Sequence, residues 1–137
     1  MARIRHVAIC TPDPQGTAEF YSKHFGFRKL EEAETEDSLA AFVTDGQINI
    51  ALMHFRMEKA IEEFQVHQGL GFTGIQHIEI QVDDIAGTYE RLKAGVVRLL
   101  TEAPGEISGE GVFFDLKVQD PNGVNIDSAT GWPSVDS

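Results

Sequence analysis

The sequence predicts an α+β fold of two tandem βαβββ modules, whose curved mixed sheets form around a cavity. Two strand-like segments carry a histidine at the same point, His6 and His77, and each is followed by a helical pattern and three further strand patterns. Shifting the chain by 71 residues superposes the two segments and the starts of their helices. The matching pairs are Ile4/Ile75, His6/His77, Ile9/Ile80, Asp13/Asp84, Gly16/Gly87, Thr17/Thr88 and Glu19/Glu90.

The length of 137 residues suits a single domain that contains both modules. The first module is predicted at about 3–55 and the second at about 74–130. The linker between them, 56–73, has mixed charge, three nearby glycines and a short helical pattern near 58–65.

The first module begins with a strand at 3–10. Asp13 is placed to cap a helix that ends at Gly26, with a buried stripe of Ala18, Tyr21 and Phe25. Strands are expected at 27–33, 38–44 and 47–55, and Asp45-Gly46 predicts a tight hairpin between the last two.

The second module repeats this order. Ile78, Ile80 and Val82 alternate with polar residues and predict a strand at 75–82. A helix capped by Asp84 follows at about 84–94, with Ile85, Tyr89 and Leu92 facing inward. Three strands are expected at 96–101, 111–118 and 124–129, with the turn Asp120-Pro121-Asn122-Gly123 before the last. A loop at 102–110 is a candidate lid, and Phe113 or Phe114 is expected to form an apolar wall.

The composition excludes several classes of partner. A net charge of −11 argues against nucleic acid and anionic membranes, which bind clustered Lys and Arg. No apolar run approaches the length of a membrane span, and the N-terminus lacks an apolar signal region. The single Cys10 excludes an internal disulfide. We therefore expect a cytoplasmic protein.

Two histidines and an acid are the candidate metal ligands. His6 and His77 lie on the first strand of their modules, and Asp127 lies on the last strand of the second. Two imidazoles and one carboxylate on rigid strands match the arrangement that holds one divalent first-row metal ion (Fe, Mn, Zn or Ni) with open positions. Such positions let a small substrate bind through oxygen atoms and be polarised.

These motifs resemble the vicinal oxygen chelate superfamily, over about residues 3–130. The resemblance rests on Arg5-His6-Val7-Ala8-Ile9, Phe20-Tyr21 with Phe25-Gly26-Phe27, Ile75-Gln76-His77-Ile78-Glu79-Ile80, and Asp120-Pro121-Asn122-Gly123 with Ile126-Asp127. That superfamily includes glyoxalase I, extradiol dioxygenases, fosfomycin-resistance enzymes, methylmalonyl-CoA epimerase and bleomycin-resistance proteins.

The resemblance implies paired βαβββ modules around a metal held by His6, His77 and Asp127. Two positions depart from the family pattern. The last-strand acid is usually Glu, which is one methylene longer than Asp127. The fourth-strand ligand of the glyoxalase and epimerase branches maps onto Ala51, which cannot bind a metal. The sequence therefore still agrees with the three-ligand pattern of the dioxygenase and fosfomycin branches.

Two further residues are candidates near this site. Glu79 faces the same side of its strand as His77, so it is a candidate general base or partner of the site; a solvated strand glutamate is the alternative. His54 is three residues beyond Ala51 and points to the opposite face unless a bulge reverses it, which makes it a possible extra ligand.

Two functions remain open. The first is a metal-dependent enzyme, with dioxygenase-like or glyoxalase-like lyase or isomerase chemistry on a substrate that chelates through adjacent oxygens. The second is a non-catalytic protein of the bleomycin-resistance kind, which sequesters a small, cationic ligand. The retention of both histidines favours the enzyme. In either case we expect a homodimer, since two-fold dimers are the commonest assembly.

Overall fold

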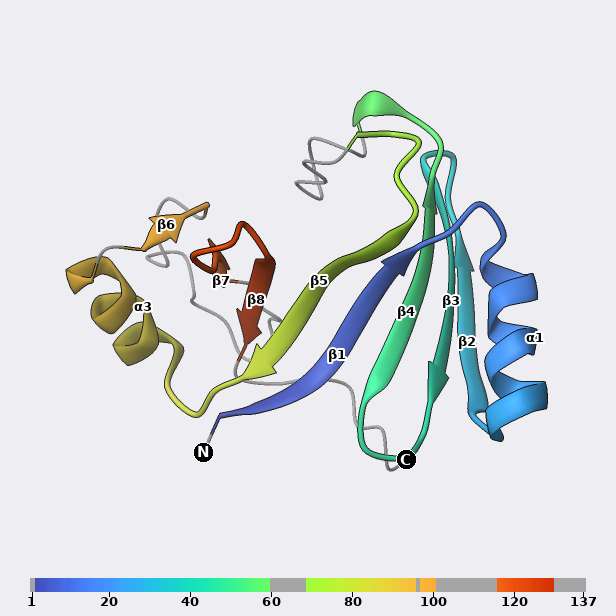
Figure 1. Cartoon of the computed structure of the whole chain (residues 1–137), viewed down its shortest axis with the longest axis horizontal. Coiled ribbons are helices and arrows are strands. Elements are labelled where there is room, and N and C mark those ends of the chain that lie inside the picture. The colour runs from blue at the N-terminus through green and yellow to red at the C-terminus, as the bar shows by residue number, and fades with distance from the viewer. Residues whose placement is uncertain (1, 60–68, 96, 101–115, 130–137) are drawn as a thin grey trace. The chain divides into compact units, whose positions relative to one another are not determined.

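The computed structural model describes residues 2–59, 69–95, 97–100 and 116–129. By their contacts these residues form two compact units, drawn in Figure 1. The first unit contains the described residues of 6–76, and the second contains the described residues from 77 onward together with the first residues of the chain.

The first unit has the order strand, helix, strand, strand, strand. Its elements are β1 (Arg3–Cys10), α1 (Pro14–Phe25), β2 (Arg28–Glu34), β3 (Ser38–Thr44) and β4 (Asn49–Phe55). The strands lie side by side in the order β2-β3-β4-β1. β4 is parallel to β1 and antiparallel to β3, and β2 is antiparallel to β3. This is one βαβββ module with a mixed sheet.

Helix α1 begins where its cap predicts. The Asp13 carboxylate accepts a hydrogen bond from the Gly16 N–H at 2.9 Å, and Pro14 occupies the first turn, where its missing N–H costs nothing. The helix ends at Gly26, whose φ of 73° is the left-handed conformation that glycine adopts without strain.

One face of the first sheet packs under α1. Ala18 of the helix contacts a buried cluster of Ala41, Val43, Ile50 and Leu52, with Tyr21 and Phe27 packed against it. Phe25 differs from the predicted stripe, because 66% of its surface is exposed. It is the last residue of the helix, where its ring contacts Phe20 and Tyr21 instead of the sheet.

The connection between β3 and β4 is longer than the predicted tight hairpin. Thr44 pairs directly with Asn49, so the loop has four residues. The Asp45 carboxylate accepts hydrogen bonds from the N–H groups of Gln47 and Ile48, at 2.8 and 2.9 Å. This local bonding removes two residues from the strand, which is why β4 begins at Asn49.

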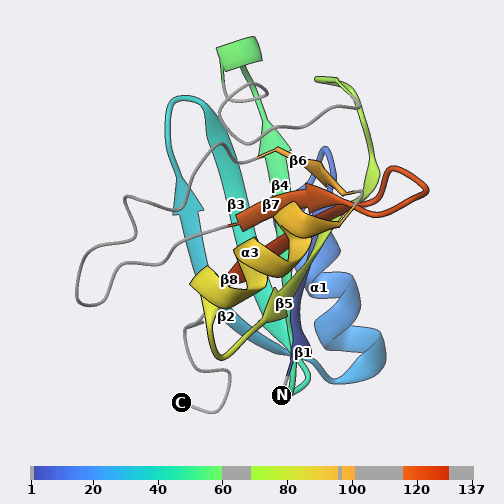
Figure 2. The same cartoon turned by 90° about the vertical axis from the view of Figure 1, so that its left-hand side faces the viewer.

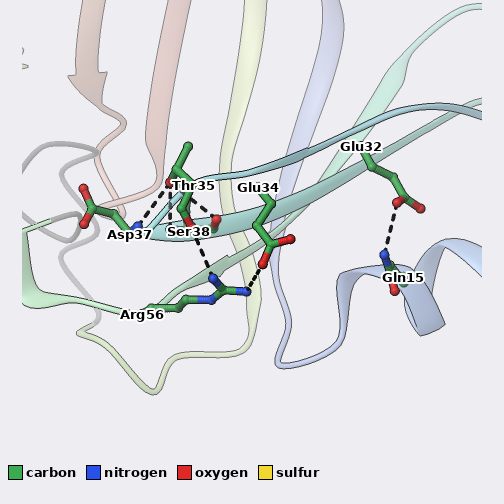
Figure 3. Close-up of polar contacts among 7 residues, drawn as sticks. All are labelled: Gln15, Glu32, Glu34, Thr35, Asp37, Ser38 and Arg56. Carbon is green, nitrogen blue, oxygen red and sulfur yellow. Dashed lines mark hydrogen bonds and ion pairs between the residues drawn. The ribbon is translucent and has the colours of Figure 1, made fainter.

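The opposite end of this sheet is tied by Arg56 (Figure 3). Its guanidinium donates to the Glu34 carboxylate at 3.0 Å and to the Thr35 carbonyl at 3.2 Å, while its backbone N–H donates to the Asp37 carbonyl. The residue after β4 is thereby fastened to the β2–β3 turn. These groups are exposed, so the contacts fix geometry more than they add free energy.

The second unit repeats the topology of the first. Its elements are β5 (Gly74–Gln81), α3 (Ile85–Ala94), β6 (Arg98–Leu99), β7 (Leu116–Gln119) and β8 (Asn125–Ala129). The strands lie in the order β5-β8-β7-β6, with β8 parallel to β5 and antiparallel to β7. The predicted α+β class and its two βαβββ modules are confirmed.

Helix α3 packs on this sheet in the way predicted (Figure 2). Ile85 and Tyr89 join Leu116 and Val118 in a buried cluster, with Leu92 packed against it. Asp84 caps the helix by accepting from the Gly87 N–H at 3.0 Å. One apolar face of the sheet is thus covered, and the polar residues of the same strands lie on the other face.

Several predictions lie outside the described residues. These are most of the linker helix near 58–65, the lid at 102–110, the start of the strand at 111–118, and Phe113 and Phe114. Among the described residues, no helix combines the length and apolar character needed to span a membrane.

Candidate metal and proton-transfer site

The polar face of the second sheet brings together most of the predicted site. The parallel register of β5 and β8 pairs His77 with Asn125 and Glu79 with Asp127. Glu79 and Asp127 are 2% and 4% exposed, and the His77 side chain is 14% exposed. Two carboxylates and an imidazole therefore lie close together on rigid strands and largely out of water.

β7 adds a cation to this face. The antiparallel register places Lys117 opposite Asp127, and the Lys117 ammonium donates to Asp127 Oδ2 at 2.7 Å. The same Oδ2 lies 3.4 Å from Nε2 of His77. Asp127 thus lies between an ammonium and an imidazole.

The surroundings keep His77 neutral. Burial lowers the pKa of His77 below its ordinary value of 6.5, and the nearby Lys117 ammonium lowers it further, against the opposing effect of the Asp127 carboxylate. A neutral imidazole has a lone pair to offer, which is the form in which histidine binds a metal.

The donor set on this face fits a divalent metal ion. A His77 ring nitrogen and a Glu79 carboxylate oxygen lie within 4.8 Å of each other. Two bonds of about 2.1 Å span at most about 4.2 Å, so one ion binds both atoms once the side chains close by the small remaining difference. Imidazole nitrogen with carboxylate oxygen suits Zn, Mn, Fe or Ni more than a soft ion.

The first unit presents the equivalent face with fewer charges. β1 and β4 pair His6 with Asn49 and Ala8 with Ala51, in the register that β5 and β8 use for His77 and Glu79. His6 is 4% exposed. The positions that hold Glu79 and Asp127 in the second unit are therefore alanines in the first. Of these paired positions, only those in the second module carry acidic side chains, and the first module has a buried histidine paired with Asn49.

His54 does not share that face. β4 pairs with β3 in an unbroken register from Asn49 to Phe55, so no bulge reverses its alternation. His54 lies on the side of Ile50 and Leu52, away from Ala51. We leave it out of the proposed metal site.

Cys10 is an inert thiol. It is 5% exposed, and burial raises its pKa to about 11. Because the thiolate is the reactive form, this cysteine is a packing residue at neutral pH.

Lys117 is a member of this polar face that the sequence prediction missed. A usable signal exists in the turn that was predicted. Asp120 accepts hydrogen bonds from Asn122 and Val124, which sets Gln119 opposite Asn125. Counting two residues back along β7 and two forward along β8 then places Lys117 opposite Asp127.

Comparisons with known proteins agree with this geometry. The family model described as "Glyoxalase/Bleomycin resistance protein/Dioxygenase superfamily" matches residues 3–127. A mitochondrial methylmalonyl-CoA epimerase of Dictyostelium discoideum is 32% identical over 131 residues, which cover 93% of this chain and 77% of that protein. An ethylmalonyl-CoA/methylmalonyl-CoA epimerase of Cereibacter sphaeroides is 30% identical over 132 residues, covering 93% of this chain and 96% of that protein.

Solved structures show the same fold. The methylmalonyl-CoA epimerase of Mycobacterium tuberculosis superposes with a TM-score of 0.71 at 23% identity, covering 95% of this chain and 88% of that chain. A methylmalonyl-CoA epimerase in complex with methylmalonyl-CoA and NH4+ gives a TM-score of 0.70 at 22% identity, covering 98% and 97%. Motifs, module topology and the matched profile together assign this chain to the glyoxalase/bleomycin resistance protein/dioxygenase superfamily.

Proposed function

We propose that this protein is a divalent-metal-dependent isomerase that inverts a carbon centre next to the carbonyl groups of a small acyl thioester. The observation that carries the proposal is the polar face of the second sheet, where a neutral histidine and two buried carboxylates lie together. Relatives at 30% identity or more, matched over most of their length, are epimerases of methylmalonyl-CoA or ethylmalonyl-CoA. We therefore take a 2-alkylmalonyl thioester as the substrate class.

The proposed metal ligands are His6, His77 and one carboxylate of the second module. His6 is included because it holds the position in its module that His77 holds in the other. When bound, a divalent ion supplies Lewis-acid polarisation of carbonyl oxygens, which makes a neighbouring C–H bond more acidic. Burial of these side chains excludes water, which would otherwise compete with substrate oxygens for the ion.

Proton transfer is the task of the remaining carboxylate. Inversion requires that one C–H bond is broken, that a basic group accepts the proton, and that a proton returns to the opposite face of the carbon. Asp127 and Glu79 are paired across β8 and β5. One of them would hold the metal and the other would accept the proton, while the proton delivered to the opposite face of the carbon would come from a solvent-exchangeable donor.

The two other functions considered from the sequence receive less support. The relatives above are isomerases, so nothing specific favours ring-cleaving oxygenation. A non-catalytic binder has no need of a neutral buried histidine beside two carboxylates, and charge on a sequestering surface works without burial.

Isotope exchange tests the proposal. The protein, loaded in turn with Co²⁺, Mn²⁺, Zn²⁺ and Ni²⁺, is incubated with a single epimer of methylmalonyl-CoA in D₂O. We expect deuterium at C2 together with formation of the other epimer. The His77→Ala variant should lose both, and His24→Ala, which removes an exposed histidine at the end of α1, should keep them. Absence of exchange with every metal, and likewise with ethylmalonyl-CoA, would refute the proposed activity.

A further inference from the structure

We propose that Glu79, and not Asp127, is the carboxylate that binds the metal. We further propose that Lys117 prevents Asp127 from binding the metal by forming an ion pair with it. The proposal rests on the metal-dependent function above and assigns the two carboxylates that the function leaves open. It reverses the roles that the sequence predicted for them.

Asp127 already has a cation. Its Oδ2 accepts from the Lys117 ammonium at 2.7 Å, and this is the oxygen that faces Nε2 of His77 at 3.4 Å. A metal that used Oδ2 would have to displace Lys117, and one that used Oδ1 would place a divalent charge next to the same ammonium. Both partners are largely buried, with side-chain exposures of 20% for Lys117 and 6% for Asp127, so breaking their pair leaves a poorly solvated ammonium beside a divalent cation.

Glu79 is better placed to meet the metal. It lies on the strand of His77, two residues away, and so projects from the same face. Its carboxylate oxygen and a His77 nitrogen lie within 4.8 Å of each other, while its surface is 2% exposed. A divalent ion bound between these two atoms would use a carboxylate that the fold has already removed from water.

The repeat supplies a second line of support. In the first module the matching positions are Ala8 and Ala51, so neither can donate to a metal. A ligand is therefore missing where Ala51 stands, and the second module has one carboxylate more than three-ligand binding needs. The extra carboxylate is accompanied by an extra cation, Lys117, because the equivalent residue of β3, Phe42, carries no charge. The assignment explains both features. Glu79 supplies the ligand that is missing at Ala51, and the extra carboxylate, Asp127, forms a neutral pair with Lys117.

Removal of the neutral pair as a unit is the discriminating experiment. Lys117→Met combined with Asp127→Asn deletes one positive and one negative charge, so the net charge around the metal is unchanged. Asp127→Asn alone removes a negative charge beside Lys117, so it would weaken metal binding through charge in either assignment. The affinity for Co²⁺ is measured for the native chain, for this double variant and for Glu79→Gln, by competition with a chelating dye. The visible spectrum of bound Co²⁺ is recorded in parallel, because it reports the ligand set.

Loss of a residue that only supports a ligand lowers metal affinity by roughly 10–100-fold, so loss of a ligand should exceed that range. We expect Glu79→Gln to lower Co²⁺ affinity more than about 100-fold, and the double variant to lower it less than about 100-fold with an unchanged spectrum. A loss of more than about 100-fold in the double variant would overturn the assignment, whatever Glu79→Gln does.

Two controls show whether a loss of Co²⁺ affinity comes from the metal site or from unfolding. Far-ultraviolet circular dichroism and thermal unfolding of each variant show whether the fold is retained, and Glu79→Asp, which keeps the carboxylate, should recover part of the affinity lost in Glu79→Gln. If the native chain binds no Co²⁺, the metal-dependent function fails as a whole. If the native chain binds and only the double variant fails to, the function stands and the assignment of Glu79 falls.

Discussion

His77 shows how burial and charge set the chemistry of one residue. Desolvation holds its pKa below 6.5, and the opposing charges of Asp127 and Lys117 partly cancel around it. The imidazole is therefore neutral at pH 7 without help from a metal. Because it binds fewer protons than the unfolded chain does at mildly acidic pH, it makes folding pH-dependent.

The free energy of unfolding of the metal-free protein should fall as the pH drops from about 6.5 through the lowered pKa of His77. In this window the unfolded chain takes up a proton that the folded protein resists, so stability is present above the window and lost below it. Urea titrations at several pH values, with a chelator present, measure the slope.

His77→Gln should flatten that slope relative to the native chain, since glutamine does not titrate. His24→Ala is the matched control and should keep the native slope, because His24 is exposed at the end of α1. An unchanged slope in His77→Gln would show that other groups carry the pH dependence.

For individual residues, strand alternation predicted only which face of a strand each side chain occupies. Alternation places His77 and Glu79 on one face, and the structure agrees. It says nothing of Lys117, because the Lys117–Asp127 pair depends on the register of two strands joined by a turn. The choice between the two carboxylates as metal ligand depends on such cross-strand pairs, so the pattern of residues along the chain could not predict it.

The two helix starts explain why the repeat survives at those positions. Asp13 and Asp84 each accept from the glycine three residues on, and Thr17 Oγ1 donates to the Asp13 carbonyl at 2.8 Å as Thr88 Oγ1 does to that of Asp84. A Cβ added at Gly16 would collide with the Asp13 carboxylate. The repeated residues are thus one capping structure, used twice.

This cap predicts a coupling between two substitutions. By helix propensity alone Gly16→Ala should stabilise the protein by about 1 kcal/mol, but it also displaces a cap worth about 1 kcal/mol. We expect Gly16→Ala to be nearly neutral in the native chain and stabilising by about 1 kcal/mol in the Asp13→Ala background. Urea denaturation of the four proteins of this cycle measures the coupling; purely additive effects would contradict the capping account.

Element boundaries were predicted well where a cap or a register fixes them. β3 agrees at both ends, and α1 begins at the predicted Pro14. The prediction of a two-residue β3–β4 hairpin was wrong, because Asp45 accepts hydrogen bonds from two backbone N–H groups beyond Asp45-Gly46. Competition between side-chain and ladder hydrogen bonds is decided by local geometry that the dipeptide does not specify.

At the scale of the whole molecule, the repeat made the fold predictable. Each module alone has few strands and one helix, so similarity at a spacing of 71 residues carried more information than any single pattern. The repeat also pairs Ala51 with Asp127, and its shift of 71 residues aligns Ala8 with Glu79; the strand registers agree with both pairings.

The assembly of the chain is a separate prediction. We expect a homodimer, since two-fold dimers are the commonest assembly of soluble proteins. Sedimentation equilibrium at several protein concentrations should give twice the mass of one chain. A single-chain mass at all concentrations would contradict the expectation and leave the proposed metal site unaffected.

The metal content of the purified protein tests the central claim most directly. Elemental analysis of the native chain, His77→Ala and His24→Ala should find close to one divalent ion per native chain, retained in His24→Ala and lost in His77→Ala. Absence of metal in all three proteins after reconstitution, or equal metal in all three, would contradict a site built on His77.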